Sequence, residues 1–391
     1  MGALREELES DGLVLPDYKR SNLTIAKQLA EGKGDLIGEK SKKIFLLMDG
    51  FGYNIFDKII TPNNIHSKML DNGRVEKITT VFPSTTPAAL ASMYSGAEPS
   101  GHGVLGTVMM LKEIGSVKKI LGWSPSMSEY LKETFENLDP LIVFPKPYIL
   151  EKLKGRAKTV FLAPEAIING GVLNSMVGTD NKIPYVSFED MLVKIARLMK
   201  EDAYDCIYAY YDATDHMQHV YSPDSEEFKA MVYGILHSFD RILSDSLEHS
   251  DYNLVLTADH GHATIRGTDT IHIGYGSKMM DYLSVPPWNE PRLRVLAAMP
   301  GNEAKLEDYF DKTYGDSGRI VNSDEAIRAG LFGSDKVGDS IRSRFGTHII
   351  IPKSNKYFEY DYPGSVKKQR STFGSHGSLS SDEMHIPVVI F

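Results

Sequence analysis

The sequence predicts an α/β fold, a three-layer sandwich in which helices cover both faces of a largely parallel central sheet. Short apolar runs without polar alternation indicate strands that are buried on both faces. Helical patterns separate these runs, and this alternation is typical of a doubly wound sheet. The pattern changes near residue 270, and we expect residues 271–370 to form a small inserted α+β subdomain. Residues 1–270 and 371–391 would then form the core.

Four apolar runs predict the strands of the core, and each ends in a polar or glycine-bearing turn. These runs are Lys43–Gly50, Lys158–Pro164, Asp205–Asp212 and Asn253–Gly261. Ser187–Asp202 and Ser225–Ser250 lie between or beside them and have the amphipathic pattern of helices. Ser187 is a good N-cap residue for the first of these helices.

The inserted part has its own pattern of elements. Arg292–Gly315 predicts a strand, a turn and a helix, and Gly346–Pro352 predicts a further strand. The chain closes with Ser371–Phe391, which predicts a glycine-rich turn followed by a buried strand.

Composition limits the classes of function. The chain has 391 residues and a formal charge of −9, which argues against binding to a nucleic-acid polymer. A single cysteine, Cys206, excludes an intrachain disulfide and favours a reducing compartment. The charged N-terminus lacks the apolar stretch of a signal peptide, and no run has the length of a membrane span. We therefore expect a soluble cytoplasmic protein without a membrane partner; the oligomeric state is left open.

Metal-binding residue types follow the predicted strands or precede the last one. The six residues are Asp49, Asp215, His219, Asp259, His260 and His376. Each could be an ordinary turn residue, but ligands gather at the carboxyl ends of parallel strands, where these segments would converge. Three carboxylates and three imidazoles suit zinc, with manganese or iron as alternatives. The sequence therefore predicts a metal site at this edge.

Three hydroxyl residues, Ser84, Thr85 and Thr86, stand directly before Pro87 and a run of small residues. This arrangement is typical of a capped helix start, with proline in the first turn. However, the segment between Ile78 and Leu111 contains no lysine or arginine. Taken alone, the hydroxyls are explained by capping.

Five motifs in order resemble those of the alkaline phosphatase superfamily, and specifically its nucleotide pyrophosphatase/phosphodiesterase-like branch. They are "MDGFG", "FPSTTPAALASMYSGAEPSGHGVLG", "DATDHMQHVYSPDS", "TADHGHA" and "FGSHG". The segments "LPDYKRSNLTIAKQLA", "GLFG" and "HGSLSSDEMHIPVVIF" are similar to bacterial and archaeal alkaline phosphatase family proteins. The resemblance runs almost from end to end.

The resemblance implies two divalent metal ions. Asp215, His219 and His376 would hold one ion. Asp49, Asp259 and His260 would hold the other, together with the nucleophile. Asp212 and His216 have the same spacing as Asp215 and His219, but Pro223 and Ser225 match the family pattern only after His219. We therefore interpret Asp212 and His216 as supporting or structural residues.

The resemblance also implies a covalent mechanism on a threonine. The family's nucleophile lies ten residues before a glycine, here Gly96, and Thr86 has that spacing, with Thr85 as the alternative. Metal coordination lowers the pKa of a hydroxyl, so the missing cations would be replaced by metal charge. Thr107 occupies the position of a phosphate-binding asparagine, and it is our candidate substrate-binding residue.

The expected activity is hydrolysis of a small-molecule phosphate ester, foremost a phosphodiester or a nucleotide pyrophosphate. Pro87 and Ala89 replace the aromatic residue and asparagine of true nucleotide pyrophosphatases. Phosphomonoesterase, phosphonate hydrolase and phosphoglycerate mutase-like phosphotransferase activities stay open, as does a metal-binding relative without turnover. A sulfatase is disfavoured, since "STTPAAL" lacks the required arginine.

Overall fold

The computed structural model describes residues 2–120, 124–125, 142–143, 152–153, 155–169, 177, 179, 181–361 and 372–391. Its centre is a seven-stranded sheet in the order β2-β18-β9-β1-β8-β6-β7. The strands are β2 (Arg74–Thr79), β18 (His385–Ile390), β9 (Tyr252–Thr257), β1 (Lys42–Met48), β8 (Cys206–Tyr211), β6 (Thr159–Pro164) and β7 (Lys182–Tyr185). All four predicted core strands, β1, β6, β8 and β9, are confirmed, as is the α/β fold with a mostly parallel sheet.

The direction of the last strand differs from that of its neighbours. β1 pairs in parallel with β8 and β9, and β6 pairs in parallel with β8 and β7. β18 is antiparallel to both β9 and β2. The glycine-rich turn before β18 lies at the carboxyl edge of the parallel strands, so the strand that leaves this turn has to run back across the sheet.

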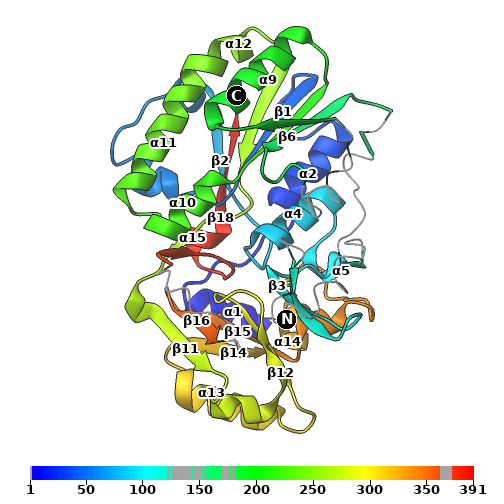
Figure 1. Ribbon diagram of the computed structural model, residues 1–391, viewed down its shortest axis with the longest axis vertical. Helices are drawn as coiled ribbons and strands as arrows, with labels where there is room; N and C mark the ends of the chain where they lie inside the picture. Colours follow the sequence, from blue (N-terminus) through cyan, green and yellow to red (C-terminus); the bar gives the residue numbers. More distant parts are fainter. Residues whose placement is uncertain are drawn as a thin grey trace.

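Helices flank the sheet on both sides, as Figure 1 shows, with α9 and α11 on one side and α2 and α4 on the other. Their bounds are α2 (Asn22–Glu31), α4 (Thr86–Ser95), α9 (Phe188–Glu201) and α11 (Glu226–Phe239). The Ser187 hydroxyl accepts a hydrogen bond from the Asp190 N–H, which confirms it as the N-cap of α9. The predicted long second helix passes through a π-helical turn, Asp240–Ser244, before α12 (Asp245–Glu248). Within the described residues, no helix has the length and apolar character that a membrane crossing requires.

A second lobe, drawn in yellow and orange in Figure 1, lies below the sheet. Its four-stranded sheet has the order β12-β13-β15-β14. The elements are β12 (Leu283–Trp288), β13 (Arg294–Ala298), β14 (Gly318–Asn322), β15 (His348–Pro352), the helix α13 (Glu303–Tyr314), and the parallel pair β11 (Thr270–Gly274) and β16 (Tyr357–Asp361). Leu4 and Leu8 of α1 (Gly2–Ser10) join the apolar cluster of this lobe with Phe332 and Phe345. The division into two domains stays a prediction.

Shorter elements complete the described chain. They are η1 (Phe56–Ile60), α3 (Lys68–Asn72), α5 (Pro99–His102), β3 (Val108–Leu111), β4 (Ser116–Lys119), β5 (Ser124–Pro125), α10 (Ala213–Tyr221), β10 (Ala263–Thr264), η5 (Gly267–Asp269), η6 (Lys278–Tyr282), α14 (Ser323–Arg328), η7 (Arg342–Phe345), β17 (Gly374–Ser375) and α15 (Ser381–Met384).

A buried ion pair ties the C-terminal turn to the second lobe. Arg292 and Glu383 are both fully buried, and Arg292 Nη2 lies 2.6 Å from Glu383 Oε2. Glu383 also accepts the N–H of Ser378 at 3.0 Å. Removal of one partner leaves the other charge buried and unpaired, which is far more costly than losing an exposed pair.

We expect Glu383→Ala to lower the free energy of unfolding by about 3–5 kcal/mol, measured by urea denaturation. The control is Asp308→Ala, which breaks the exposed pair between Asp308 and Lys312 and should cost at most about 1 kcal/mol. Equal, small effects of the two substitutions would contradict the structural role of the buried pair.

Candidate metal centre

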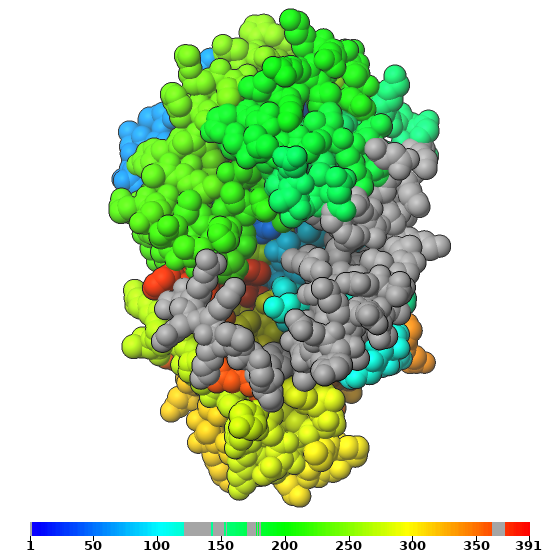
Figure 2. Space-filling view, in the orientation of Figure 1, coloured from blue at the N-terminus to red at the C-terminus, as the bar shows by residue number. Residues whose placement is uncertain are grey.

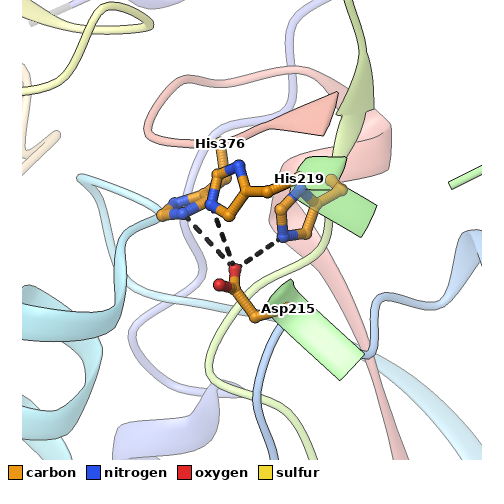
Figure 3. Close-up of side chains that lie close together, drawn as sticks. Asp215, His219 and His376 are labelled. Carbon is orange, nitrogen blue, oxygen red and sulfur yellow. Dashed lines mark hydrogen bonds and ion pairs between the residues drawn. The ribbon is translucent and has the colours of Figure 1, made fainter. Parts of the chain in front are cut away.

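The predicted metal ligands come together at the carboxyl edge of the sheet. Asp49 follows β1, Asp259 and His260 follow β9, and His376 follows β17. Asp215 and His219 stand one helical turn apart on α10. In Figure 3 the Asp215 carboxylate faces the rings of His219 and His376.

The ligand atoms form two overlapping groups, each with its atoms within 4.8 Å of one another. One group contains Asp215, His219, His262 and His376, and the other contains Asp49, Asp215 and His260. Asp215 therefore belongs to both groups. Asp259, which the sequence predicted as a ligand beside Asp49 and His260, belongs to neither group, but its Oδ2 lies 3.4 Å from His260 Nε2.

Backbone carbonyl groups orient three of the imidazoles. Nδ1 lies 2.7 Å from the Gly374 oxygen in His219, 3.1 Å from the Ser84 oxygen in His376, and 3.1 Å from the Gly261 oxygen in His260. A proton on Nδ1 serves each of these bonds, so Nε2 is left bare and faces the carboxylates. A hydrogen bond to the far ring nitrogen of this kind is the usual arrangement around a metal-binding histidine.

Burial keeps three histidines of this edge, His260, His262 and His376, neutral. Burial lowers the pKa of His260 to about 3 and that of His262 to about 4. The pKa of His376 is also far below its usual value, first because of burial and then because of the nearby His260. Neutral imidazole is the form that binds a metal ion.

The two buried carboxyl groups beside His260, those of Asp49 and Asp259, have raised pKa values. Burial, and then the charges of Asp259 and Asp215, raise the pKa of Asp49 well above its usual range. Burial raises the pKa of Asp259 to about 7. Oδ1 of Asp259 accepts the N–H groups of Gly50 and His260, both at 2.9 Å, whereas its buried Oδ2 accepts no hydrogen bond within the described part of the chain. An oxygen–nitrogen donor set with such a bare oxygen fits divalent metal ions.

Gly50 permits the close approach of these segments. Its φ is +69°, which favours glycine. A Cβ at this position would lie 2.9 Å from the His262 ring and 3.1 Å from the Asp215 Cα. Gly50, the first glycine of "MDGFG", therefore lets the turn after β1 pack directly against α10.

The hydroxyls of Thr85 and Thr86 have different partners. Thr86 is the first residue of α4, and its Oγ1 lies 3.0 Å from His260 Nε2 and 3.4 Å from Asp49 Oδ1. Thr85 is the N-cap residue, but its side chain makes no capping hydrogen bond and instead donates to Glu290 Oε1 at 3.1 Å. Helix capping therefore does not account for either hydroxyl, and Thr86 is the one that faces the carboxylates and imidazoles.

Three other predicted residues lie apart from the two groups. Among the described residues, neither group that could hold a metal includes Asp212 or His216, and His216 is exposed. Thr107 lies just before β3, where its N–H donates to Glu290 Oε1 at 2.6 Å. Thr107 therefore shares Glu290 with Thr85.

Sequence reasoning missed His262 and Tyr210, which both contact predicted metal ligands. The Tyr210 hydroxyl donates a hydrogen bond to Asp49 Oδ2. His262 Nε2 lies 2.7 Å from Asp215 Oδ1, and its buried Nδ1 has no hydrogen-bond partner within the described residues. We assign the proton to Nε2, so that His262 donates to Asp215 and orients it. The second histidine of "TADHGHA" was the available signal.

We expect His262→Ala to weaken the binding of one metal ion by about 10–100-fold, because Asp215 loses its orienting donor. The measurement is metal retention during titration with a chelator. His272→Ala, which removes an exposed histidine of β11, is the control and should leave retention unchanged. Unchanged retention in both variants would mean that His262 does not support the site.

Comparisons with known proteins concern the family and the fold of the chain. A model of the type I phosphodiesterase/nucleotide pyrophosphatase family matches residues 43–379, which is well over half of the chain. Human ectonucleotide pyrophosphatase/phosphodiesterase 5 has a similar structure, with a TM-score of 0.66 and 17% identity, covering 89% of this chain and 87% of that one.

Two further structures share the fold. An inactive threonine-to-alanine variant of the murine ectonucleotide pyrophosphatase/phosphodiesterase 5, in complex with AMP, matches with a TM-score of 0.63 and 17% identity, covering 90% and 88% of the two chains. Phosphonoacetate hydrolase from Sinorhizobium meliloti 1021, in complex with phosphonoformate, matches with a TM-score of 0.64 and 16% identity, covering 90% of each chain. At these identities the likeness shows the fold alone. The family match and the two-group centre together place the chain in the type I phosphodiesterase/nucleotide pyrophosphatase family of the alkaline phosphatase superfamily.

Proposed function

We propose that the protein hydrolyses small phosphate esters, foremost phosphodiesters or nucleotide pyrophosphates, through a covalent intermediate on Thr86. The observation that carries this proposal is the position of Thr86 Oγ1, 3.0 Å from His260 Nε2 and 3.4 Å from Asp49 Oδ1. The inactive threonine-to-alanine variant of the murine relative supports it by analogy.

The residues divide into two sets of expected ligands. Asp49, Asp259 and His260 would hold one divalent ion beside Thr86, and Asp215, His219 and His376 would hold the other. Zinc is the expected metal, with manganese or iron as alternatives. When bound, such ions lower the pKa of a coordinated hydroxyl and neutralise charge on the attacking and leaving oxygens.

Thr86 would attack in line, forming the bond between Oγ1 and phosphorus while the bond to the leaving alcohol or phosphate breaks and the hydroxyl proton passes, through solvent, to the departing oxygen. Water would then cleave the bond between Oγ1 and phosphorus, releasing the second product and restoring the hydroxyl. The backbone N–H groups at the start of α4 favour negative charge on a phosphoryl oxygen. No lysine or arginine is needed in this segment for that purpose.

Metal analysis of the purified protein, with rates on p-nitrophenyl esters, tests the proposal. The panel contains bis(p-nitrophenyl) phosphate, p-nitrophenyl phosphate, p-nitrophenyl phenylphosphonate and p-nitrophenyl sulfate. We expect two metal equivalents and the highest rate on the diester. A higher monoester or phosphonate rate would move the assignment to the corresponding hydrolase, and transfer without water-dependent release would favour a phosphotransferase.

The cytoplasmic location, the lack of a nucleic-acid or membrane partner and the small-molecule substrate stay predictions. The only cysteine, Cys206, is buried as a free thiol in β8, and this arrangement is compatible with a reducing compartment.

A further inference from the structure

Glu290 of the second lobe contacts two threonines near the candidate site. It lies between β12 and β13, and its Oε1 accepts the Thr85 hydroxyl at 3.1 Å and the Thr107 N–H at 2.6 Å. Thr85 directly precedes Thr86. Thr107 is our candidate substrate-binding residue, and its backbone N–H is bonded to this carboxylate.

Asn289 fixes the backbone of Glu290. Asn289 is buried with a φ of +73°, its Oδ1 accepts the Glu290 N–H at 2.9 Å, and its Nδ2 donates to the Leu105 oxygen at 2.9 Å. A Cβ on Gly106 would lie 1.5 Å from Asn289 Oδ1, so this contact requires glycine. The backbone of Glu290 is therefore fixed, and the bonds from Thr85 and Thr107 hold its carboxylate before any substrate binds.

Glu290 also borders the segment that carries His376. A Cβ on Gly377 would lie 3.1 Å from Glu290 Cβ. In Figure 2 the front face is hollowed between the green upper part and the yellow lower part, and red residues of the C-terminal segment are visible at the hollow. Glu290 thus contacts or approaches three segments that carry predicted site residues.

Within the described ranges, Glu290 makes no ion pair, and its Oε2 accepts no hydrogen bond. The nearby Arg294 donates to the Asn289 oxygen at 2.6 Å and not to the Glu290 carboxylate. The side chain is only partly exposed, so water screens its charge less than it would on an open surface.

We propose that Glu290 selects substrates by phosphoryl charge, disfavouring doubly charged phosphomonoesters relative to singly charged phosphodiesters. Like charges repel more strongly in a partly dehydrated site than in water. A diester carries one negative charge on its phosphoryl group and a monoester carries up to two, so a fixed carboxylate penalises the monoester more. Such a repulsive group provides specificity without adding any contact to the preferred substrate. The inference rests on the proposed hydrolase function.

The test compares kcat/KM for bis(p-nitrophenyl) phosphate and p-nitrophenyl phosphate in the metal-loaded wild type and in Glu290→Gln. Glutamine keeps Oε1 as an acceptor for Thr85 and Thr107 but removes the charge. We expect the ratio of diester to monoester kcat/KM to fall at least about tenfold. Glu303→Gln, at the start of α13 in the same lobe, is the matched control and should leave the ratio unchanged.

Binding measurements separate this inference from the proposed function. In a metal-loaded Thr86→Ala background, calorimetry gives the Kd of phenyl phosphate and of methyl phenyl phosphate with and without Glu290→Gln. If Glu290→Gln lowers the Kd of phenyl phosphate about tenfold and leaves the Kd of methyl phenyl phosphate unchanged, the role of Glu290 is supported. This result would count even if the wild type hydrolyses no diester and the proposed function fails. If the ratio of the Kd of phenyl phosphate to that of methyl phenyl phosphate is the same with Glu290 and with Gln at this position, the inference is overturned, whatever the enzyme hydrolyses.

Discussion

Thr86→Ala should lower turnover of the best phosphodiester by about a thousandfold or more, because no other serine or threonine of the described residues has its hydroxyl within hydrogen-bond distance of both Asp49 and His260. Thr86 Oγ1 is within 3.4 Å of both His260 Nε2 and Asp49 Oδ1. The loss of a simple helix cap would instead cost about 1 kcal/mol of stability and leave turnover largely intact. Steady-state kinetics on folded, metal-loaded protein distinguish the two outcomes.

Two variants serve as controls for this result. Thr86→Ser keeps a hydroxyl in reach and should retain substantial activity. Thr85→Ala removes a hydroxyl that points to Glu290, so its effect should be comparatively mild. Near-wild-type turnover of Thr86→Ala would refute the assignment, and an inactive Thr85→Ala beside an active Thr86→Ala would transfer the role to Thr85.

Substitutions in the two ligand groups should cause separable losses of metal. Asp49→Ala should remove one metal equivalent and abolish formation of the covalent intermediate, because Asp49 belongs only to the group beside Thr86. His219→Ala should remove the other equivalent, since His219 belongs only to the group with His262 and His376. Asp215 is less informative because it lies in both groups. Elemental analysis after gel filtration measures the metal content.

His216→Ala is the matched control for His219→Ala, since both histidines are on α10 and His216 is exposed. It should keep two equivalents and normal turnover. If Asp49→Ala and His219→Ala also keep both equivalents and full activity, the ligand assignment is wrong.

Local pattern predicted the parts of the fold whose causes are local. The runs that form β1, β6, β8 and β9 are apolar because both faces of these strands are buried. Such strands can therefore be recognised from the sequence. The direction of β18 depends on its pairing with β9 and β2, which no property of its own residues encodes. The π-helical turn at Asp240–Ser244 was likewise not predicted, because the apolar periodicity of Ser225–Ser250 indicated one continuous helix.

Only those residues of the candidate site that stand in sequence motifs could be predicted. Asp49, Asp259 and His376 stand in short motifs at strand ends, so their convergence could be expected from the sheet. Glu290 could not, because it is 183 residues from Thr107 in sequence and stands in no recognisable motif. His262 was visible in "TADHGHA", but its contact with Asp215 depends on the turn at Gly50, which brings α10 beside it.

Intact-protein mass spectrometry of acid-quenched reactions tests the central claim, the covalent intermediate on Thr86, most directly. The enzyme is mixed with excess diester, quenched within one turnover, and digested to locate the modified peptide. We predict a mass increase equal to the transferred phosphoryl group and its retained ester, located on Thr86 and missing from Thr86→Ala. An unmodified Thr86 peptide during active turnover, or the same adduct on another residue, would contradict the mechanism.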